Sequence, residues 1–357
     1  MSSVYNCCLT QSGRITTQKW YLIHNRGKHL IKGLLSKLPG RALDGGNTLA
    51  LTLEDNSLRY VLASNTSAQG ATLVAWGTEL RGSQTRVAFT KRVKSLLPSA
   101  KRSIAVLVPR EYQILQIDSP NVPPEEMVSA VRWRAMEFVE GSPNDYTFDV
   151  LAVVAEAGRS ENVIAVVAHN DIVRARMVDC VELGHPLSVI DVAETALRNL
   201  LHAQLLSEPD ASDVAAALVA DAGRALMIVT VKGELCFFRR FEFDSDIFAA
   251  TVDHVQSALI GTNAGAEALA RSLTQLHRSL DLWDDLYPQT PLVSLWVDAG
   301  RRTDAIIELL KIETRLDTRP FDLSPVFKLP IGKAPPPWKD AAYLPLLGAL
   351  LRPKVKS

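Results

Sequence analysis

The chain has 357 residues, of which 39 are basic and 39 are acidic, so its formal net charge is zero. This length can bury a large core over two or three domains, and an apolar fraction of 47% argues against extensive disorder. The neutral balance excludes the broad positive field by which proteins attract nucleic acid or anionic lipid.

The cysteines and the hydropathy pattern indicate the cellular compartment of the protein. The four cysteines, at positions 7, 8, 180 and 236, form no CxxC pair and no Cys/His cluster with zinc-site spacing. So few cysteines in so long a chain are typical of a reducing compartment. The sequence also shows no run of about 18 apolar residues and no signal-peptide core. We therefore expect a cytoplasmic protein without a metal site, held at a membrane only through partners.

Residues 1–45 are polar and glycine-rich, and we expect an N-terminal extension there. Within it, apolar residues recur at helical spacing between 29 and 38, with three lysines around them. This stretch fits a basic amphipathic helix that contacts a membrane or a partner. It fits equally a short helix packed on the domain, or a frayed leader.

An α/β pattern begins at residue 46. The predicted elements of this region, in chain order, are a strand at 49–53, a turn at 55–57, strands at 58–63 and 73–76, a helix at 85–97 and a short buried strand at 104–108. The first two strands and their turn read as a β-hairpin.

A compact βαββ unit follows. Its predicted elements are a strand at 112–117, a helix that starts at the Pro-Pro-Glu-Glu run 123–126, strands at 148–155 and 163–168, and then a helix at 171–183 that ends before Gly184. Prolines with acidic residues in the first turn are typical of a helix start, because they suit its dipole and its missing hydrogen bonds.

The second half repeats the theme of the first. Asp191 and Glu194 have the spacing of a capping box before another helix. The elements predicted after it are strands at 216–220, 226–231 and 235–243, a long amphipathic helix over 269–283, a strand at 292–297 and a helix at 303–310. A hairpin-led sheet with helices thus occurs twice, which indicates duplication of one α/β unit.

Several short motifs resemble a known family. They are VPREYQIL at 108–115, PNVPPEEM at 120–127, AVRWR at 130–134, FDV at 148–150, SVIDV at 188–192, PF at 320–321 and LGALLR at 347–352. In this order they are similar to PilM-type proteins of type IV pilus assembly, most of all to the MSHA pilus branch. The resemblance covers roughly residues 46–352.

The resemblance implies an α/β, actin-like (ASKHA) fold of two lobes with an inserted subdomain of the 1C type. The implied division is an extension at 1–45, a first lobe (1A) at 46–107 and 176–212, the inserted subdomain at 108–175, a second lobe (2A/2B) at 213–330, and a proline-rich linker with a C-terminal helix at 331–357 that packs back on the body. The apolar run 344–351 is too short to span a bilayer.

In this family a nucleotide would lie between the lobes, held by glycine-bearing turns and acidic residues that direct Mg²⁺. Here the Mg²⁺-directing aspartate of the first hairpin is Thr52, and the phosphate-approaching glycine is Glu54, whose charge would repel phosphate. The second hairpin keeps Asp221 and Gly223, and the adenosine turn keeps Gly300. We expect a degenerate site with no bound cofactor, ATP being the one candidate.

No other catalytic pattern is present in the sequence. It contains no HExxH, P-loop, GxGxxG or GxSxG motif, and its acidic pairs fall at helix starts or on helix surfaces. We therefore expect a scaffold without enzymatic activity. The alternatives are an ATP-binding switch of the same machine, or a GspL-like cytoplasmic component of type II secretion.

By the same resemblance, the expected partners are the N-terminal peptide of a PilN-like inner-membrane protein and the pilus motor ATPase, with self-association open and no nucleic acid. The peptide groove is expected between the strands at 112–117 and 148–154 and the helix at 125–139. Its candidate contacts are Tyr112, Ile114, Met127 and Trp133. For Trp133, ordinary core packing is the alternative to an anchoring role.

Overall fold

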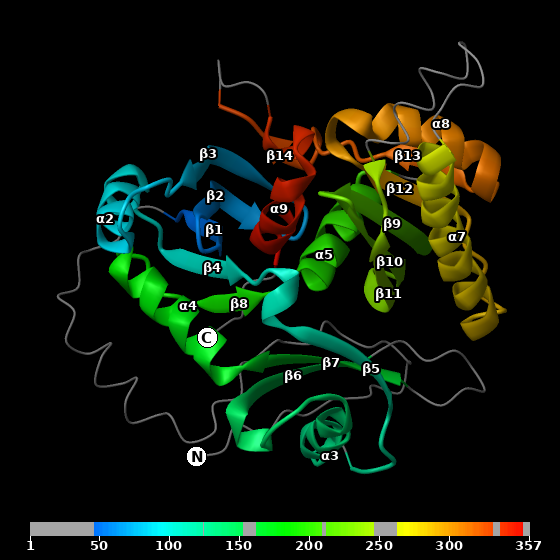
Figure 1. The fold of residues 1–357 in the computed structure, drawn as a ribbon, viewed down its shortest axis with the longest axis horizontal. Helices are drawn as coiled ribbons and strands as arrows, with labels where there is room; N and C mark the ends of the chain where they lie inside the picture. Colours follow the sequence, from blue (N-terminus) through cyan, green and yellow to red (C-terminus); the bar gives the residue numbers. More distant parts are fainter. Residues whose placement is uncertain are drawn as a thin grey trace.

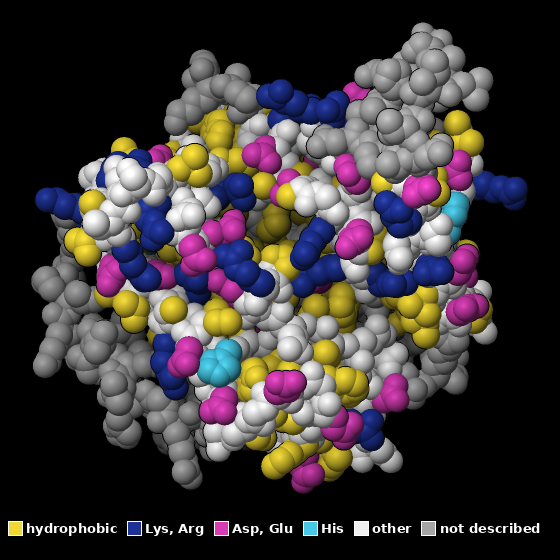
Figure 2. All heavy atoms as spheres, in the orientation of Figure 1, with side chains coloured by type: hydrophobic (Ala, Val, Ile, Leu, Met, Phe, Trp, Pro, Cys, Tyr) yellow, Lys and Arg dark blue, Asp and Glu magenta, His cyan; other side chains and the backbone are white. Residues whose placement is uncertain are grey.

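The computed structural model describes residues 46–123, 125–152, 162–208, 212–245, 263–330 and 336–352. The expected extension at 1–45, with its amphipathic stretch, lies outside these ranges. Figure 1 shows two lobes side by side and a smaller sheet below them. Basic and acidic side chains are interspersed over the face in Figure 2, as the neutral composition leads one to expect.

The first lobe is a six-stranded sheet in the order β14-β3-β2-β1-β4-β8. Its strands are β1 Thr48–Leu53, β2 Ser57–Ser67, β3 Gly70–Leu80, β4 Arg102–Val106, β8 Val189–Asp191 and β14 Phe327–Lys328. Alternation along β1 decides what packs on each face. Leu49 and Leu51 pack on one face against α2 (Arg86–Leu96) and α4 (Asn170–Glu182). Ala50 packs on the other face, against α5 (Ala193–Leu206) and α9 (Leu344–Leu350).

The second lobe is a five-stranded sheet in the order β11-β10-β9-β12-β13. Its strands are β9 Val214–Asp221, β10 Arg224–Val231, β11 Glu234–Glu242, β12 Ser294–Asp298 and β13 Asp317–Pro320, flanked by α7 Asn263–Leu286 and α8 Thr303–Thr314. Lys232 and Gly233 join β10 to β11 with φ of 54° and 80°, the left-handed values of a tight hairpin turn.

The inserted subdomain is a three-stranded antiparallel sheet in the order β5-β7-β6, which confirms the predicted βαββ unit. Its elements are β5 Gln113–Asp118, α3 Met127–Ala135, β6 Tyr146–Ala152 and β7 Asn162–His169. The residues on one face of the sheet, among them Phe148, form a core with Val131 and Ala135 of α3. The opposite face lies toward the two lobes.

Helices α5 and α9 pack between the two lobes (Figure 1). The last helix is almost wholly buried, as an apolar helix that packs back on the body should be. Gly348 allows α9 to approach α5 closely, since a Cβ at that position would lie 2.0 Å from the Ala196 carbonyl oxygen.

Three features differ from the sequence-based expectations. Strand β14 pairs with β3, so the chain re-enters the first lobe before residue 330. Helix α4 runs continuously across the expected boundary at 175/176. The predicted capping box is wrong, because Val192 is the N-cap of α5, without a side-chain bond, and the Glu194 side chain is buried instead.

Within the described residues, no helix has both the length and the apolar character needed to cross a bilayer.

Candidate functional site

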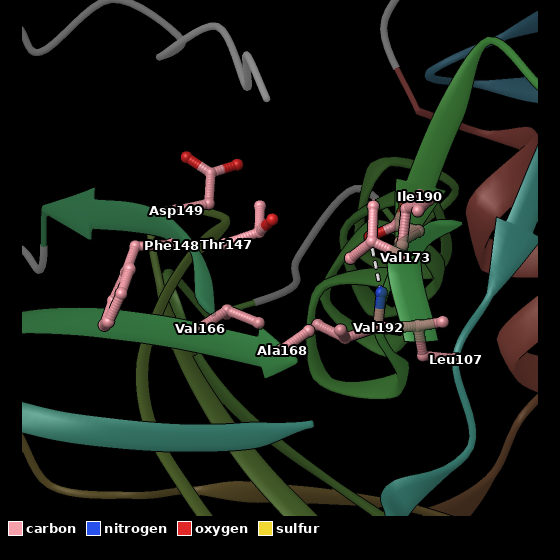
Figure 3. A pocket seen from close by; sticks show the side chains of 10 residues that line it. Leu107, Thr147, Phe148, Asp149, Val166, Ala168, Val173, Ile190 and Val192 are labelled. Carbon is pink, nitrogen blue, oxygen red and sulfur yellow. Dashed lines mark hydrogen bonds between the residues drawn. The ribbon is translucent and has the colours of Figure 1, made fainter. Parts of the chain in front are cut away.

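A small groove of about 50 Å³, half open to solvent, lies between the inserted subdomain and the first lobe. The inserted sheet contributes Thr147, Phe148, Asp149, Val166 and Ala168, and the first lobe contributes Leu107, Val173, Ile190, Asp191 and Val192. Figure 3 shows these two groups facing each other from separate elements. Six of these ten side chains are aliphatic, so the groove is mainly an apolar surface that water touches.

Within the part of the chain that the structure describes, two sheet edges that carry no further strand border this groove. β6 is an edge strand of the inserted sheet, and β8 is an edge strand of the first-lobe sheet. An edge strand presents backbone N–H and C=O groups that can accept one more strand. An extended peptide satisfies such groups while its alternate side chains enter apolar pockets. The arrangement therefore suits the capture of an extended segment.

The polar residues of the groove differ in how they are engaged. Thr147 donates a hydrogen bond to Asn170 Oδ1 at 2.7 Å. Asp191 accepts from the Val192 N–H at 2.9 Å and forms an ion pair with Arg352 at 3.1 Å. Burial raises the pKa of Asp149 to about 8, and the nearby Arg352 opposes that rise.

Asp149 and Thr147 point to the same side of β6, and Phe148 points to the other (Figure 3). This is the two-residue alternation of a strand. It places the Asp149 carboxylate over the groove rather than in the core under α3.

The structure does not bring the four predicted partner contacts together. Tyr112 is 5% exposed, and its hydroxyl donates to Glu194 Oε2 at 2.6 Å and also contacts Arg240. Burial, followed by the Glu194 charge, raises the pKa of this phenol well above its usual value. Ile114 packs against the buried cores on the lobe side of the sheet. Tyr112 is therefore part of the interior, which corrects its expected place on a binding surface.

Met127 and Trp133 lie on α3, across the inserted sheet from the groove. Met127 packs on the subdomain core, and Trp133 is 70% exposed, so the core-packing alternative for Trp133 is wrong. The expected boundary of the groove by the helix at 125–139 is corrected as well. The helix covers one face of the sheet, and the groove lies on the other.

The predicted nucleotide residues lie at the turns that the fold directs toward the space between the lobes. Thr52 donates to the Val106 carbonyl at 3.3 Å, so its hydroxyl serves the sheet. Glu54 ion-pairs with Arg110 at 3.4 Å. The two side chains thus form a partly exposed ion pair beside the first hairpin.

Asp221 and Gly223 form the β9–β10 turn, in which Gly223 has φ of 78° and its carbonyl accepts from the Phe243 N–H at 3.0 Å. Asp221 is exposed, yet its pKa is raised. The main cause is partial desolvation by the surrounding protein, and the negative charge of Asp340 adds to it. Burial also raises the pKa of Asp298, beside the Gly300 turn, to about 6. Both carboxyl groups therefore hold a proton to higher pH than a solvent-exposed aspartate does.

The chain's own C-terminal segment closes this space. A Cβ at Gly300 would lie 3.5 Å from the Lys339 carbonyl oxygen, so the adenosine-type turn is in contact with residues 339–341. On the opposite side, Arg59 donates to the Ala342 carbonyl at 3.5 Å, and its guanidinium lies 5.4 Å from the centre of the Tyr343 ring. The segment therefore touches the turn of one lobe and the sheet of the other.

The sequence reasoning missed a buried charge network. Arg240 of β11 contacts both Tyr112 and Glu194, with 2.5 Å from Arg240 Nη2 to Glu194 Oε1. It joins the second lobe, the inserted subdomain and α5 at one point. The sequence does contain a pattern that indicates this network. Glu194 lies three residues before Leu197 and seven before Leu201, which places it on the buried face of its helix. A carboxylate on such a face requires a partner.

Comparison with known proteins supports the fold. No protein-family profile and no curated protein matches the sequence. Among solved structures, a "PilM-PilN type IV pilus biogenesis complex" is 18% identical with a TM-score of 0.64, over 86% of this chain and 99% of that one. The cytoplasmic domain of EpsL, an inner-membrane component of the Vibrio cholerae type II secretion system, is 10% identical with a TM-score of 0.43, over 86% and 95%. The fold is actin-like, as predicted.

Proposed function

We propose that the chain is a cytoplasmic scaffold of type IV pilus biogenesis, of the MSHA type represented by MshI, without enzymatic activity. It docks the N-terminal peptide of a PilN-like inner-membrane protein and links that protein to the pilus motor ATPase. The observation that carries the proposal is the apolar groove between two sheet edges. The likeness to a PilM structure named for its complex with PilN supports this choice of partner.

The groove is suited to a peptide that arrives extended. Leu107, Val166, Ala168 and Val192 form its buried apolar floor, and the half-exposed Ile190, Thr147 and Asp149 stand at its rim. A peptide strand against β6 or β8 gains backbone hydrogen bonds, and its alternate side chains then determine its register.

Peptide binding is the direct test. Thr147→Arg places a long charged side chain in the groove from a partly exposed position. We expect this substitution to weaken binding of the N-terminal PilN-like peptide by at least about tenfold, because the arginine side chain blocks apolar contacts near the centre of the surface. Calorimetric titration of the purified chain measures the affinity.

The matched control is Trp133→Ala, on α3 and across the inserted sheet, which should leave the affinity unchanged. The reverse result, loss at Trp133 and none at Thr147, would move the peptide site to α3. Absence of binding to the wild-type chain would reject the docking function.

A second titration tests the nucleotide site. We expect ATP with Mg²⁺ to give no saturable heat and no rise in Tm, because Glu54, Asp221 and Asp298 repel phosphate and residues 339–343 hold the space between the lobes. A ligand at about 100 times its Kd would add about 2.7 kcal/mol of stability, which a thermal scan detects easily. Binding at micromolar strength would instead favour the ATP-dependent switch.

A further inference from the structure

We propose that Asp149 determines the specificity of the groove, by selecting an extended peptide that carries a lysine or arginine among apolar side chains. The inference rests on the proposed docking function and adds the chemistry of the occupant. It starts from the one carboxylate of the groove that the surrounding structure leaves available.

The two acidic residues of the groove are not equivalent. Asp191 already has partners, since it accepts from Val192 N–H and from the Thr195 hydroxyl at 2.5 Å and pairs with Arg352. Asp149 has, among the described residues, only the N–H of its neighbour Val150 at 2.9 Å. A carboxylate can accept about four hydrogen bonds, so most of the capacity of Asp149 is unused.

The surroundings of Asp149 favour a cation as its partner. The side chains that share the groove are mostly aliphatic and cannot donate to it. A largely desolvated carboxylate is costly unless it is paired. The charged groups that act on it are Asp191 of β8 and Arg352 after α9, and Arg352 is engaged with Asp191. A metal ion is a poor alternative, because Ca²⁺ and Mg²⁺ need several oxygen ligands.

The strand geometry places the Asp149 carboxylate beside the path that an added peptide strand would follow. Asp149 lies on β6, whose outer edge pairs with no strand of the described residues, so a peptide strand added there would run alongside the carboxylate. Thr147 and Asp149 are two residues apart and face the same side (Figure 3). A cationic residue that alternates with apolar ones in the peptide would therefore meet Asp149 in one register only.

The pairing also predicts a pH dependence. The pKa of Asp149 is about 8, so the free protein carries this carboxyl mainly protonated at neutral pH. Binding of a cation requires the ionised form and so releases a proton. Affinity for a cationic peptide should rise by about 25-fold between about pH 6.5 and 8.5, because the ionised fraction of a carboxyl with a pKa of about 8 rises by that factor.

The experiment uses the N-terminal peptide of the PilN-like protein from the same organism, in its native form and with each Arg or Lys replaced by a neutral isostere. At pH 8.5, where the Asp149 carboxyl is mainly ionised, we expect Asp149→Asn to weaken binding of the native peptide by about tenfold. The variant should also abolish the pH dependence, and the neutral peptide should bind both proteins alike. Asp118→Asn, at the exposed end of β5 in the same sheet, is the matched control and should change nothing.

Two results would overturn the inference while the docking function stands. One is equal affinity of the native peptide for wild type and Asp149→Asn at both pH values. The other is tight binding by a native peptide that contains no lysine or arginine. If no peptide binds the wild-type chain at all, the docking function itself fails, and the assignment of Asp149 fails with it.

Discussion

Arg240→Met is expected to destabilise the protein by about 3–5 kcal/mol, the range for loss of one partner from a buried ion pair. Glu194 is fully buried, and Arg240 is the cation in contact with it. The substitution preserves most of the side-chain volume and removes only the charge and the donors. Among the described residues, the Glu194 carboxylate would then keep the Tyr112 hydroxyl as its side-chain hydrogen-bond donor in the interior.

The loss should depend on pH. Burial raises the pKa of Glu194, and the Arg240 charge is the chief factor that lowers it. Without Arg240 the folded-state pKa of Glu194 rises further above the unfolded value. The folded state then holds a proton that the unfolded state releases, so stability is retained at low pH and lost as pH rises through the folded-state pKa. Urea denaturation at several pH values measures this.

Two further variants make the result interpretable. Arg319→Met removes the exposed pair with Glu208 at 2.9 Å and should cost about 0–1 kcal/mol. The double variant Glu194→Gln with Arg240→Met should recover much of the loss, because no buried charge is then left alone. A loss below about 1 kcal/mol for Arg240→Met, with unchanged m-value, would mean that the network does not hold the lobes and the inserted subdomain together.

Gly348→Ala is expected to cost at least about 1–3 kcal/mol, the usual range for overpacking in a well-packed core. Its Cβ would lie 2.0 Å from the carbonyl oxygen of Ala196, and that atom belongs to the backbone of α5. Backbone cannot rotate aside as a side chain does, so α9 must move away from α5. Leu344, Leu347 and Leu350, which are all fully buried, would then lose part of their packing.

The matched control is Gly46→Ala, since no atom lies within 4 Å of a Cβ there. Alanine is a better helix former than glycine by about 1 kcal/mol, so at position 348 helix propensity alone predicts a gain. Thermal and urea denaturation therefore distinguish the two effects by sign. A stabilised Gly348→Ala variant would contradict the close approach of α9 to α5.

The sequence predicted the elements well and the candidate site only in part. The strands at 49–53 and 226–231 and the helix at 85–97 were predicted because their apolar residues recur with period two or with helical spacing. The peptide groove predicted from the sequence lies beside the strand of Phe148 on the face that α3 covers, whereas the groove seen in the structure lies on the opposite face of that sheet. Which face α3 covers depends on the handedness of the connection and on packing, which a single strand does not encode.

The same limit explains the fate of Tyr112 and Trp133. Both are large aromatic residues in the motif-bearing region, and the sequence alone offers no reason to bury one and expose the other. Tyr112 is buried because a carboxylate 82 residues later and an arginine 128 residues later meet its hydroxyl. Trp133 is exposed because Val131 and Ala135 take the inward positions on α3.

By itself, the sequence determined the local order of the chain: where strands and helices form, the insertion of a βαββ unit between two similar halves, and the presence of Thr52 and Glu54 in the first hairpin. These depend on periodicity and residue chemistry within a few positions. Tertiary structure alone decided that β14 pairs with β3, that residues 339–343 close the space between the lobes, and that Asp149 faces a groove. Each of these joins segments far apart in the chain, and such contacts depend on how whole surfaces fit together rather than on any local pattern.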